Sequence, residues 1–187
     1  RDRFKNVAWV NGTLTVTKRD VTITSANLSK GYDGKALTNG DTALATESGW
    51  ANGEGASYTF TGSQTLVGSS ANAFSYTLNS NTKADNYVIT KTEGTLTVTN
   101  RDAKYEITVE ANGGSYKYDG TEKSVSGLKE TTFIVEGSKY TVSGLTAEAK
   151  ATDAGSYTVN VTGTETVKDA EDHDVTAQFT VKRENGT

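Results

Sequence analysis

The 187-residue chain contains no cysteine, no proline and no methionine. The absence of cysteine excludes disulfides, thiolate zinc sites and cysteine nucleophiles together. Without proline, the turns depend on the 19 glycines and on Asn and Asp, which reach positive φ at low cost. Because the chain shows neither a starting Met nor a signal-peptide pattern, we expect an internal piece of a longer protein.

The chain also has little net charge and no long apolar run. Its formal net charge is -4 and its pI is about 5.1. We therefore expect no basic patch and no polybasic segment. Without these, neither a nucleic-acid partner nor an electrostatic membrane anchor is expected. No apolar run reaches the 18 residues or so of a membrane span, so we expect no membrane insertion. The apolar fraction of 34%, glycine not counted, predicts small cores with polar surfaces.

What the sequence does contain is an internal repeat. Residues 12–20 read GTLTVTKRD and residues 94–102 read GTLTVTNRD. Three further triplets return at a similar period: Tyr32-Asp33-Gly34 as Tyr118-Asp119-Gly120, Tyr58-Thr59-Phe60 as Tyr140-Thr141-Val142, and Ser75-Tyr76-Thr77 as Ser156-Tyr157-Thr158. The period drifts, which indicates loop insertions, and the longest is expected near Lys168–Val175. Recurrence at a fixed period indicates a tandem array of one domain.

Apolar residues alternate with polar ones in the manner of half-buried strands. The pattern is clearest at Leu14 and Val16, at Val21 and Ile23, and across residues 105–109. The best helical candidate, Thr146–Lys150, is too short to form a helix alone. We therefore expect a mostly β protein.

The phase of this alternation changes at Arg19-Asp20 and again at Arg101-Asp102. Because successive side chains of a strand point to opposite faces, each change marks a junction between domains. The predicted domains are 1–18 (terminal strands of a preceding repeat), 19–100 (repeat domain 1) and 101–187 (repeat domain 2, lacking its last strand). The junctions contain neither Gly nor Pro, which favours a semi-rigid string of domains. An orphan strand at one end and a vacancy at the other predict that the N-terminal segment either frays or fills the vacancy of a neighbouring molecule by strand exchange.

The recurring motifs resemble a known family. The Tyr-Asp-Gly triplets, residues 155–158 (GSYT), residues 86–89 (NYVI) and the closing Gly-Thr-Leu-Thr-Val are similar to YDG/MBG-type ("mostly β-grasp") repeats of bacterial adhesins and cell-wall proteins. The resemblance implies tandem β-grasp-like domains on the extracellular bacterial surface, acting as a stalk without catalysis or cofactor. The alternatives are repeats that bind host glycan or protein directly, and an accessory domain of a cell-wall enzyme. One departure is that Ala36 and Glu122 stand near the place where the family has proline.

Several residues are candidates for turns, binding or catalysis. In the Tyr-Asp-Gly triplets we expect Asp33 and Asp119 to organise turns, with Gly34 and Gly120 at positive φ. The spacing of Asp153, Gly155 and Tyr157 is also that of a tyrosine corner, which leaves an Ig-like β-sandwich as the alternative fold. The acidic cluster of Asp169, Glu171, Asp172 and Asp174 favours a solvated loop over a calcium site, since its spacing is not that of an EF-hand.

Nothing in the sequence converges on a catalytic site. His173, the one histidine, lies among acidic residues. The sequence contains no Gly-x-Ser-x-Gly motif whose serine it could activate as a general base. We therefore expect no enzyme. Trp9 is predicted to lie in a core. Trp50 lies in a glycine-rich loop and is the one weak candidate for a binding anchor, although a tryptophan folded back on its own domain is the more common outcome.

Overall fold

A computed structural model describes residues 8–187, and the chain is mostly β, as the sequence predicts. Strands account for 50% of the chain and helix for 3%, the latter as two 3-10 turns. The strands are β1 (Arg19–Thr24), β2 (Leu28–Gly31), β3 (Leu37–Thr38), β4 (Thr46–Ser48), β5 (Ala56–Phe60), β6 (Ser63–Gln64), β7 (Gly68–Ala71), β8 (Phe74–Leu78), β9 (Tyr87–Thr92), β10 (Thr95–Thr99), β11 (Tyr105–Glu110), β12 (Lys123–Ser126), β13 (Thr132–Val135), β14 (Ser138–Ala151), β15 (Asn160–Lys168) and β16 (Phe179–Glu184). The turns are η1 (Ala84–Asn86) and η2 (Thr176–Gln178).

The chain divides into two compact units. The first unit consists of the chain up to Leu28, Thr38–Ser63 and Ser70–Leu96. The second consists of Ser29–Leu37, Gln64–Ser69 and Thr97–Thr187. These units differ from the predicted domains, because three short segments of residues 19–100 group with the second unit.

Each unit contains a parallel pair of strands that lie far apart in the sequence. In the first unit β1 pairs with β9, and Val21 lies opposite Ile89. In the second unit β11 pairs with β16, and Ile107 lies opposite Val181. On β1 and β11 alternate side chains are buried, because one face of each strand lies on a core. The strands that the alternation predicts at these residues are confirmed.

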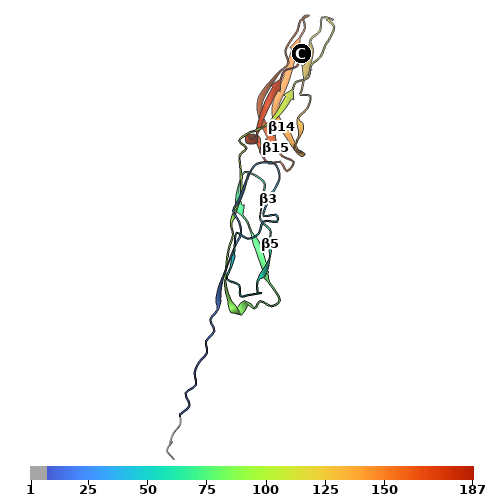
Figure 1. Cartoon of the computed structure of the whole chain (residues 1–187). Coiled ribbons are helices and arrows are strands. Elements are labelled where there is room, and N and C mark those ends of the chain that lie inside the picture. Colours follow the sequence, from blue (N-terminus) through green and yellow to red (C-terminus); the bar gives the residue numbers. More distant parts are fainter. Residues whose placement is uncertain (1–7) are drawn as a thin grey trace, which may run out of the picture. The chain divides into compact units, whose positions relative to one another are not determined.

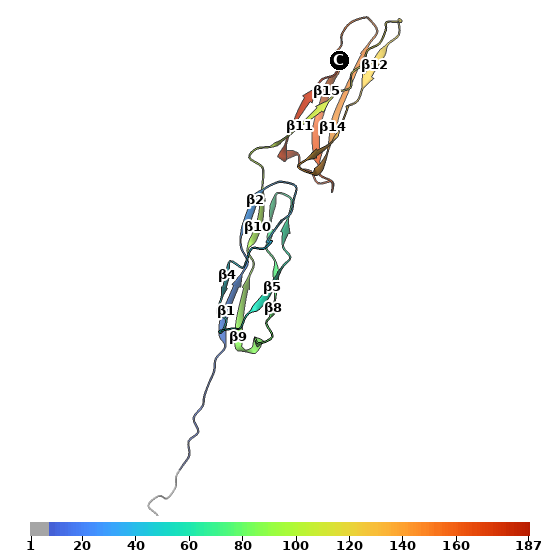
Figure 2. The same cartoon turned by 45° about the vertical axis from the view of Figure 1, so that its right-hand side comes forward.

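A three-stranded sheet places β10 between β2 and β7, and Figure 2 shows β2 beside β10. The side chains of Leu96 and Val98 are 0% and 1% exposed, whereas Thr95 and Thr99 are exposed. The strand predicted for the second GTLTVT segment is therefore present and embedded between two neighbours.

The longest strand, β14, pairs with β12, β13 and β15 in the second unit, and Figure 1 shows it beside β15. Its register with β15 shifts between Ser143 and Leu145. Gly144 and Gly163 face each other at this irregularity with φ of +82° and +107°, and a Cβ on either would overlap backbone of the other strand. Only glycine can adopt this positive φ and also leave room for the facing backbone. The segment Thr146–Lys150 lies inside β14 and is strand, not helix.

The longest insertion of the second unit is in the β14–β15 hairpin, so its predicted position near Lys168–Val175 is wrong. Phe60 pairs with Phe74 across β5 and β8. Val142, which matches Phe60 in sequence, pairs with Val167. The chain between the paired residues is longer in the second unit because the hairpin extends much further there.

One of the sequence alignments is also wrong. Residues 75–77 lie in β8 and pair with β5, whereas residues 156–158 lie between β14 and β15. The two segments have the same Ser-Tyr-Thr sequence but occupy different positions in the fold. The two segments cannot be told apart from their residues, because Ser, Tyr and Thr are common throughout a strand-rich chain.

Of the two alternatives expected for the N-terminal segment, fraying or strand exchange, residues 8–18 show no pairing within the described chain. Residues 8–18 belong to no strand and are exposed, and Figure 1 draws them as an extended trace. Trp9 is 90% exposed, so its expected place in a core is wrong. Leu14 and Val16 are 90% and 86% exposed, although their copies Leu96 and Val98 are buried. Residues 1–7, the remainder of the predicted terminal strands, lie outside the described residues.

Within residues 8–187, no helix has the length and apolar character needed to cross a membrane.

Candidate functional site

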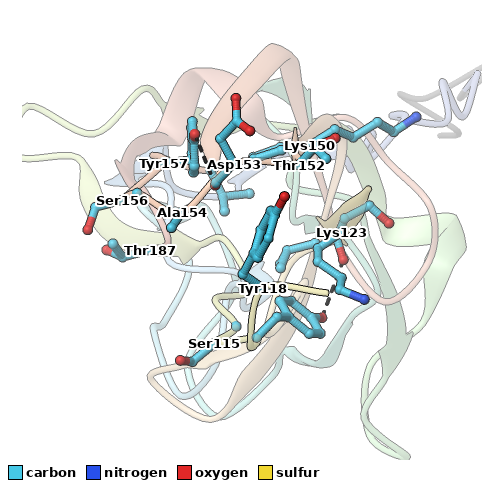
Figure 3. A pocket seen from close by; sticks show the side chains of 18 of the residues that line it. Ser115, Tyr118, Lys123, Lys150, Thr152, Asp153, Ala154, Ser156, Tyr157 and Thr187 are labelled. Carbon is cyan, nitrogen blue, oxygen red and sulfur yellow. Dashed lines mark hydrogen bonds between the residues drawn. The ribbon is translucent and has the colours of Figure 1, made fainter. Parts of the chain in front are cut away.

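A groove on the second unit is the candidate site (Figure 3). It is lined by residues 114–118, 123–125 and 149–157, together with Val159 and Thr187, and has a volume of about 420 Å³. In the close view, Tyr118 stands between Ser115 on one side and Asp153 on the other. We call it the second-unit groove.

Three tyrosines give the second-unit groove its apolar surface. Tyr116, Tyr118 and Tyr157 are 59%, 68% and 44% exposed. The Tyr157 hydroxyl donates to the Asp153 carbonyl oxygen at 3.2 Å, which is the bond expected of a tyrosine corner. The Tyr157 ring is nevertheless exposed, so it is not the buried tyrosine that such a corner would contain. Exposed rings that border a groove provide flat contact area for a bound chain.

Two of the three lysines that line the groove are paired. Lys123 donates to Asp119 at 2.6 Å and Lys150 to Glu148 at 2.8 Å. Hydrogen bonds from Lys123 and Thr121 hold the pKa of the Asp119 carboxyl well below its usual range. The other charged side chains of the lining, Lys117 and Asp153, have opposite signs, so the groove presents little net charge to an occupant.

The two Tyr-Asp-Gly triplets have the same local geometry. Asp33 Oδ1 accepts a hydrogen bond from the Lys35 N–H, and Asp119 Oδ1 accepts one from the Thr121 N–H, both at 2.9 Å. The glycine that follows each aspartate, Gly34 or Gly120, has φ of +73° or +78°. This is the arrangement of an Asx turn followed by a residue at positive φ.

The tyrosines of these triplets differ in environment. Tyr32 is 1% exposed, whereas Tyr118 is 68% exposed and lies in the second-unit groove. The turn is therefore common to both triplets, and the accessible aromatic side chain belongs to the second alone.

Trp50, the weak binding candidate, packs on the first unit. Its ring lies edge-on to Tyr87 with 5.0 Å between the ring centroids, and its indole N–H donates to Glu47 at 3.2 Å. The Tyr58 hydroxyl donates to the same carboxylate at 2.7 Å. Trp50 thus belongs to the edge of the first unit's core, apart from the groove.

Titration of Tyr58 should make the first unit pH-sensitive. Burial, followed by the hydrogen bond to Glu47, raises the pKa of Tyr58 to about 12. The tyrosines of an unfolded chain ionise near pH 10. Between these two values the unfolded state loses its proton while the folded state keeps it, so the free energy of unfolding should fall as the pH rises from 10 to 12.

The measurement is urea unfolding followed by tryptophan fluorescence across this pH range. We expect the Tyr58→Phe variant to show a shallower fall, and the Tyr116→Phe variant in the other unit to retain the full one. An equally steep fall in Tyr58→Phe would contradict this role of the Tyr58 hydroxyl.

The acidic segment after β15 forms a turn. Asp169 Oδ1 accepts from the N–H groups of Glu171 and His173, and its Oδ2 lies 3.1 Å from His173 Nδ1. Asp174 Oδ1 accepts from the Thr176 N–H and hydroxyl. Among residues 8–187 no group of three or more His, Cys, Asp or Glu side chains is arranged to hold a metal ion. These carboxylates therefore serve local turn geometry.

Comparisons with family models, curated proteins and solved structures found no match for this chain.

The second-unit groove itself was not predicted from the sequence. Its usable signal was the alternation of Tyr116 and Tyr118, with Lys117 between them. That alternation marks a strand-like segment with two aromatics on one face. The other side of the groove depends on the long β14–β15 hairpin, which the sequence alignment placed elsewhere.

Proposed function

We propose that the chain is a non-catalytic spacer segment, built from tandem copies of one β-grasp-like domain, in an extracellular surface protein of the bacterial adhesin type. The observation that carries the proposal is the parallel strand pair present in each unit. Arg19 faces Tyr87 at the start of β1–β9, and Tyr105 faces Phe179 at the start of β11–β16. A 3-10 turn precedes the second strand of both pairs.

The parallel pair also favours the β-grasp-like fold. An Ig-like sandwich is built from two antiparallel sheets. In each unit the first strand of the parallel pair instead lies beside a strand that comes much later in the chain and runs the same way. This arrangement brings the beginning and the end of a unit into one ladder.

A spacer has to resist tension, and this ladder is oriented to do so. In the second unit, tension pulls β11 at Tyr105 and β16 at Glu184 in opposite directions along parallel strands. The hydrogen bonds between the strands are then loaded together in shear. If the same pair were pulled from one end, the bonds would be loaded one after another.

Force spectroscopy on the intact chain tests this proposal. Because the chain contains no cysteine, handles are attached through introduced thiols. One variant carries Lys104→Cys and Glu184→Cys, which loads the β11–β16 pair in shear. The matched variant carries Lys104→Cys and Thr180→Cys, which loads the pair near its first rung. The replaced side chains are exposed. We expect a clearly higher unfolding force for the first variant, since its rungs break together.

Equal forces in the two variants would contradict a load-bearing role for the parallel pair. The direct-binding alternative rested on Trp50, and that ring packs on Tyr87 instead of standing free.

A further inference from the structure

Several asparagines of this chain are followed by glycine, the dipeptide most prone to spontaneous loss of a side-chain amide, because glycine has no side chain to shield its backbone nitrogen. The pairs within residues 19–187 are Asn39-Gly40, Asn52-Gly53, Asn112-Gly113 and Asn185-Gly186. The reaction needs an accessible side-chain amide, an accessible glycine nitrogen, and rotation of the peptide unit that joins the two residues. The hydrogen bonds of each pair therefore decide whether it reacts in the folded protein.

The Asn52-Gly53 pair lies at the centre of a turn. The turn is closed by a hydrogen bond of 3.0 Å from the Glu54 N–H to the Ala51 carbonyl. Gly53 has φ of +77°, the value typical of the second central residue of a type II turn. The closing bond does not involve the peptide unit between Asn52 and Gly53, so that unit can rotate while the turn stays closed. Within residues 8–187, neither the Asn52 side chain nor the Gly53 N–H makes a hydrogen bond, and both residues are exposed.

The bonds that anchor this turn also avoid the reacting atoms. The Asn81 side-chain amide donates to the Gly53 carbonyl at 2.6 Å. The Ala51 N–H donates to the Tyr87 hydroxyl at 3.1 Å. Both bonds use peptide units on either side of the one between Asn52 and Gly53. The turn therefore holds its place on the first unit and presents the reacting groups to water.

The Asn39-Gly40 pair has the opposite environment. Asn39 is 2% exposed, its Oδ1 accepts from the Asn72 amide at 2.6 Å, and its own amide donates to the Thr42 carbonyl. The Asn39 backbone carbonyl accepts from the Thr42 N–H at 3.1 Å, so rotation of the reacting peptide unit would break a further bond. Loss of the amide at Asn39 therefore requires local unfolding.

The other two pairs are each restrained at a reacting group. The Asn112 side-chain amide donates to the Ser126 carbonyl at 3.0 Å. Beside Asn185, the attacking nitrogen is restrained, because the Gly186 N–H donates to the Val159 carbonyl at 3.0 Å. Of the four pairs, only the one in the turn leaves every reacting group without a hydrogen bond among the described residues.

We propose that Asn52 is a site of spontaneous covalent modification in the folded protein. The Gly53 nitrogen gives its proton to base and attacks Cγ of Asn52. The new bond from nitrogen to Cγ forms, the bond from Cγ to the amide nitrogen breaks, and ammonia leaves after taking a proton from solvent. The resulting succinimide then takes up one water. Opening at one carbonyl gives aspartate, and opening at the other gives isoaspartate, in which the main chain runs through the side chain. Nothing is oxidised or reduced.

The modification changes the edge of the first unit's core. Either product adds a carboxylate close in sequence to Glu54, whose own carboxylate accepts a hydrogen bond from the Tyr87 hydroxyl. Isoaspartate also lengthens the backbone of the turn by one methylene, and Trp50, which packs on Tyr87, lies just before that turn. Because the lost ammonia is not restored, the modified fraction increases with the age of the protein. This inference does not depend on the spacer proposal.

Peptide mapping by mass spectrometry tests the proposal on the intact folded chain, incubated at mildly alkaline pH. Each converted asparagine gains about 1 Da, and chromatography separates isoaspartate from aspartate. We expect product to form about 30-fold faster at Asn52 than at Asn39, since the Asn39 side chain must first give up two hydrogen bonds and its buried position. In guanidinium chloride the two rates should become similar, because the protection at Asn39 is lost on unfolding.

The Asn52→Gln variant tests the effect on the turn, since glutamine closes the corresponding larger ring much more slowly. We expect tryptophan emission of the parent chain to drift in step with conversion at residue 52, and the emission of Asn52→Gln to stay constant. A drift of equal size in Asn52→Gln would overturn the effect on Trp50. The modification site itself is overturned if Asn52 reacts no faster than Asn39 in the folded chain. It is equally overturned if the product is aspartate without isoaspartate, because a succinimide opens to both.

Discussion

Replacing Ile23 by alanine should lower the free energy of unfolding of the first unit by about 2–5 kcal/mol, the range found for truncating a fully buried isoleucine. The Ile23 side chain is 0% exposed and lies in the cluster formed with Val21, Phe74 and Tyr87. Its loss leaves a cavity that the surrounding β-ladder cannot close. Since the free energy of unfolding of a small domain is only about 5–15 kcal/mol, the substitution removes a large part of the stability of the first unit.

Tryptophan fluorescence isolates this effect. Of the two tryptophans, Trp50 packs on Tyr87 in the first unit and Trp9 is exposed, so the folding signal comes from the first unit. We expect Ile23→Ala to move the urea midpoint seen by fluorescence. Ile107→Ala, the same substitution at a buried position of the corresponding strand β11 in the second unit, should move the circular-dichroism transition and leave fluorescence unchanged. A shift in fluorescence from Ile107→Ala would show that the units do not unfold independently.

Replacing Asn72 by alanine should destabilise the first unit by about 2–5 kcal/mol, since it leaves one buried and one half-buried acceptor without their donor. Asn72 is fully buried, and its amide donates to the Ala26 carbonyl at 2.9 Å and to Asn39 Oδ1 at 2.6 Å. Its backbone carbonyl accepts from the Ser25 hydroxyl, which in turn accepts from the Gly94 N–H. Its own Oδ1 accepts no hydrogen bond from the described residues, so removing that atom offsets a small part of the loss.

The matched control is Asn81→Ala, which removes an exposed amide that donates to the Gly53 carbonyl. We expect a change of about 0.5 kcal/mol or less there, because water replaces the lost partner. Thermal unfolding of both variants, followed by fluorescence, compares them directly. If Asn72→Ala unfolds at the same temperature as the parent, the buried amide network does not contribute to stability.

Local strand structure was predictable from the sequence because alternation acts over a few residues. Val21 and Ile23 on β1, and Ile107 and Val109 on β11, are buried as their spacing predicts. The turns at the Tyr-Asp-Gly triplets follow equally local chemistry, the short aspartate side chain and a glycine at positive φ. Neither depends on a distant partner.

Pairing between distant segments was not predictable in the same way. Leu14 and Leu96 occupy identical hexapeptides, yet one is exposed and the other buried, because β10 has β2 and β7 beside it and residues 8–18 have no such neighbours among the described residues. The groove likewise depends on how far the β14–β15 hairpin extends. An alignment of short Ser, Thr and Tyr motifs carries no information about that length.

The parallel ladders also set the order in which the chain can fold. β1 cannot complete its pairing until β9 has been made, and β11 depends in the same way on β16. Contacts between such distant segments give a high relative contact order, for which folding in milliseconds to seconds is typical. During synthesis each unit stays open until its last paired strand emerges. Until then, the edge of β1 that will pair with β9 is unpaired, and the apolar side chains of Val21 and Ile23 are exposed. The nascent chain is therefore most vulnerable to misassociation just before each unit closes.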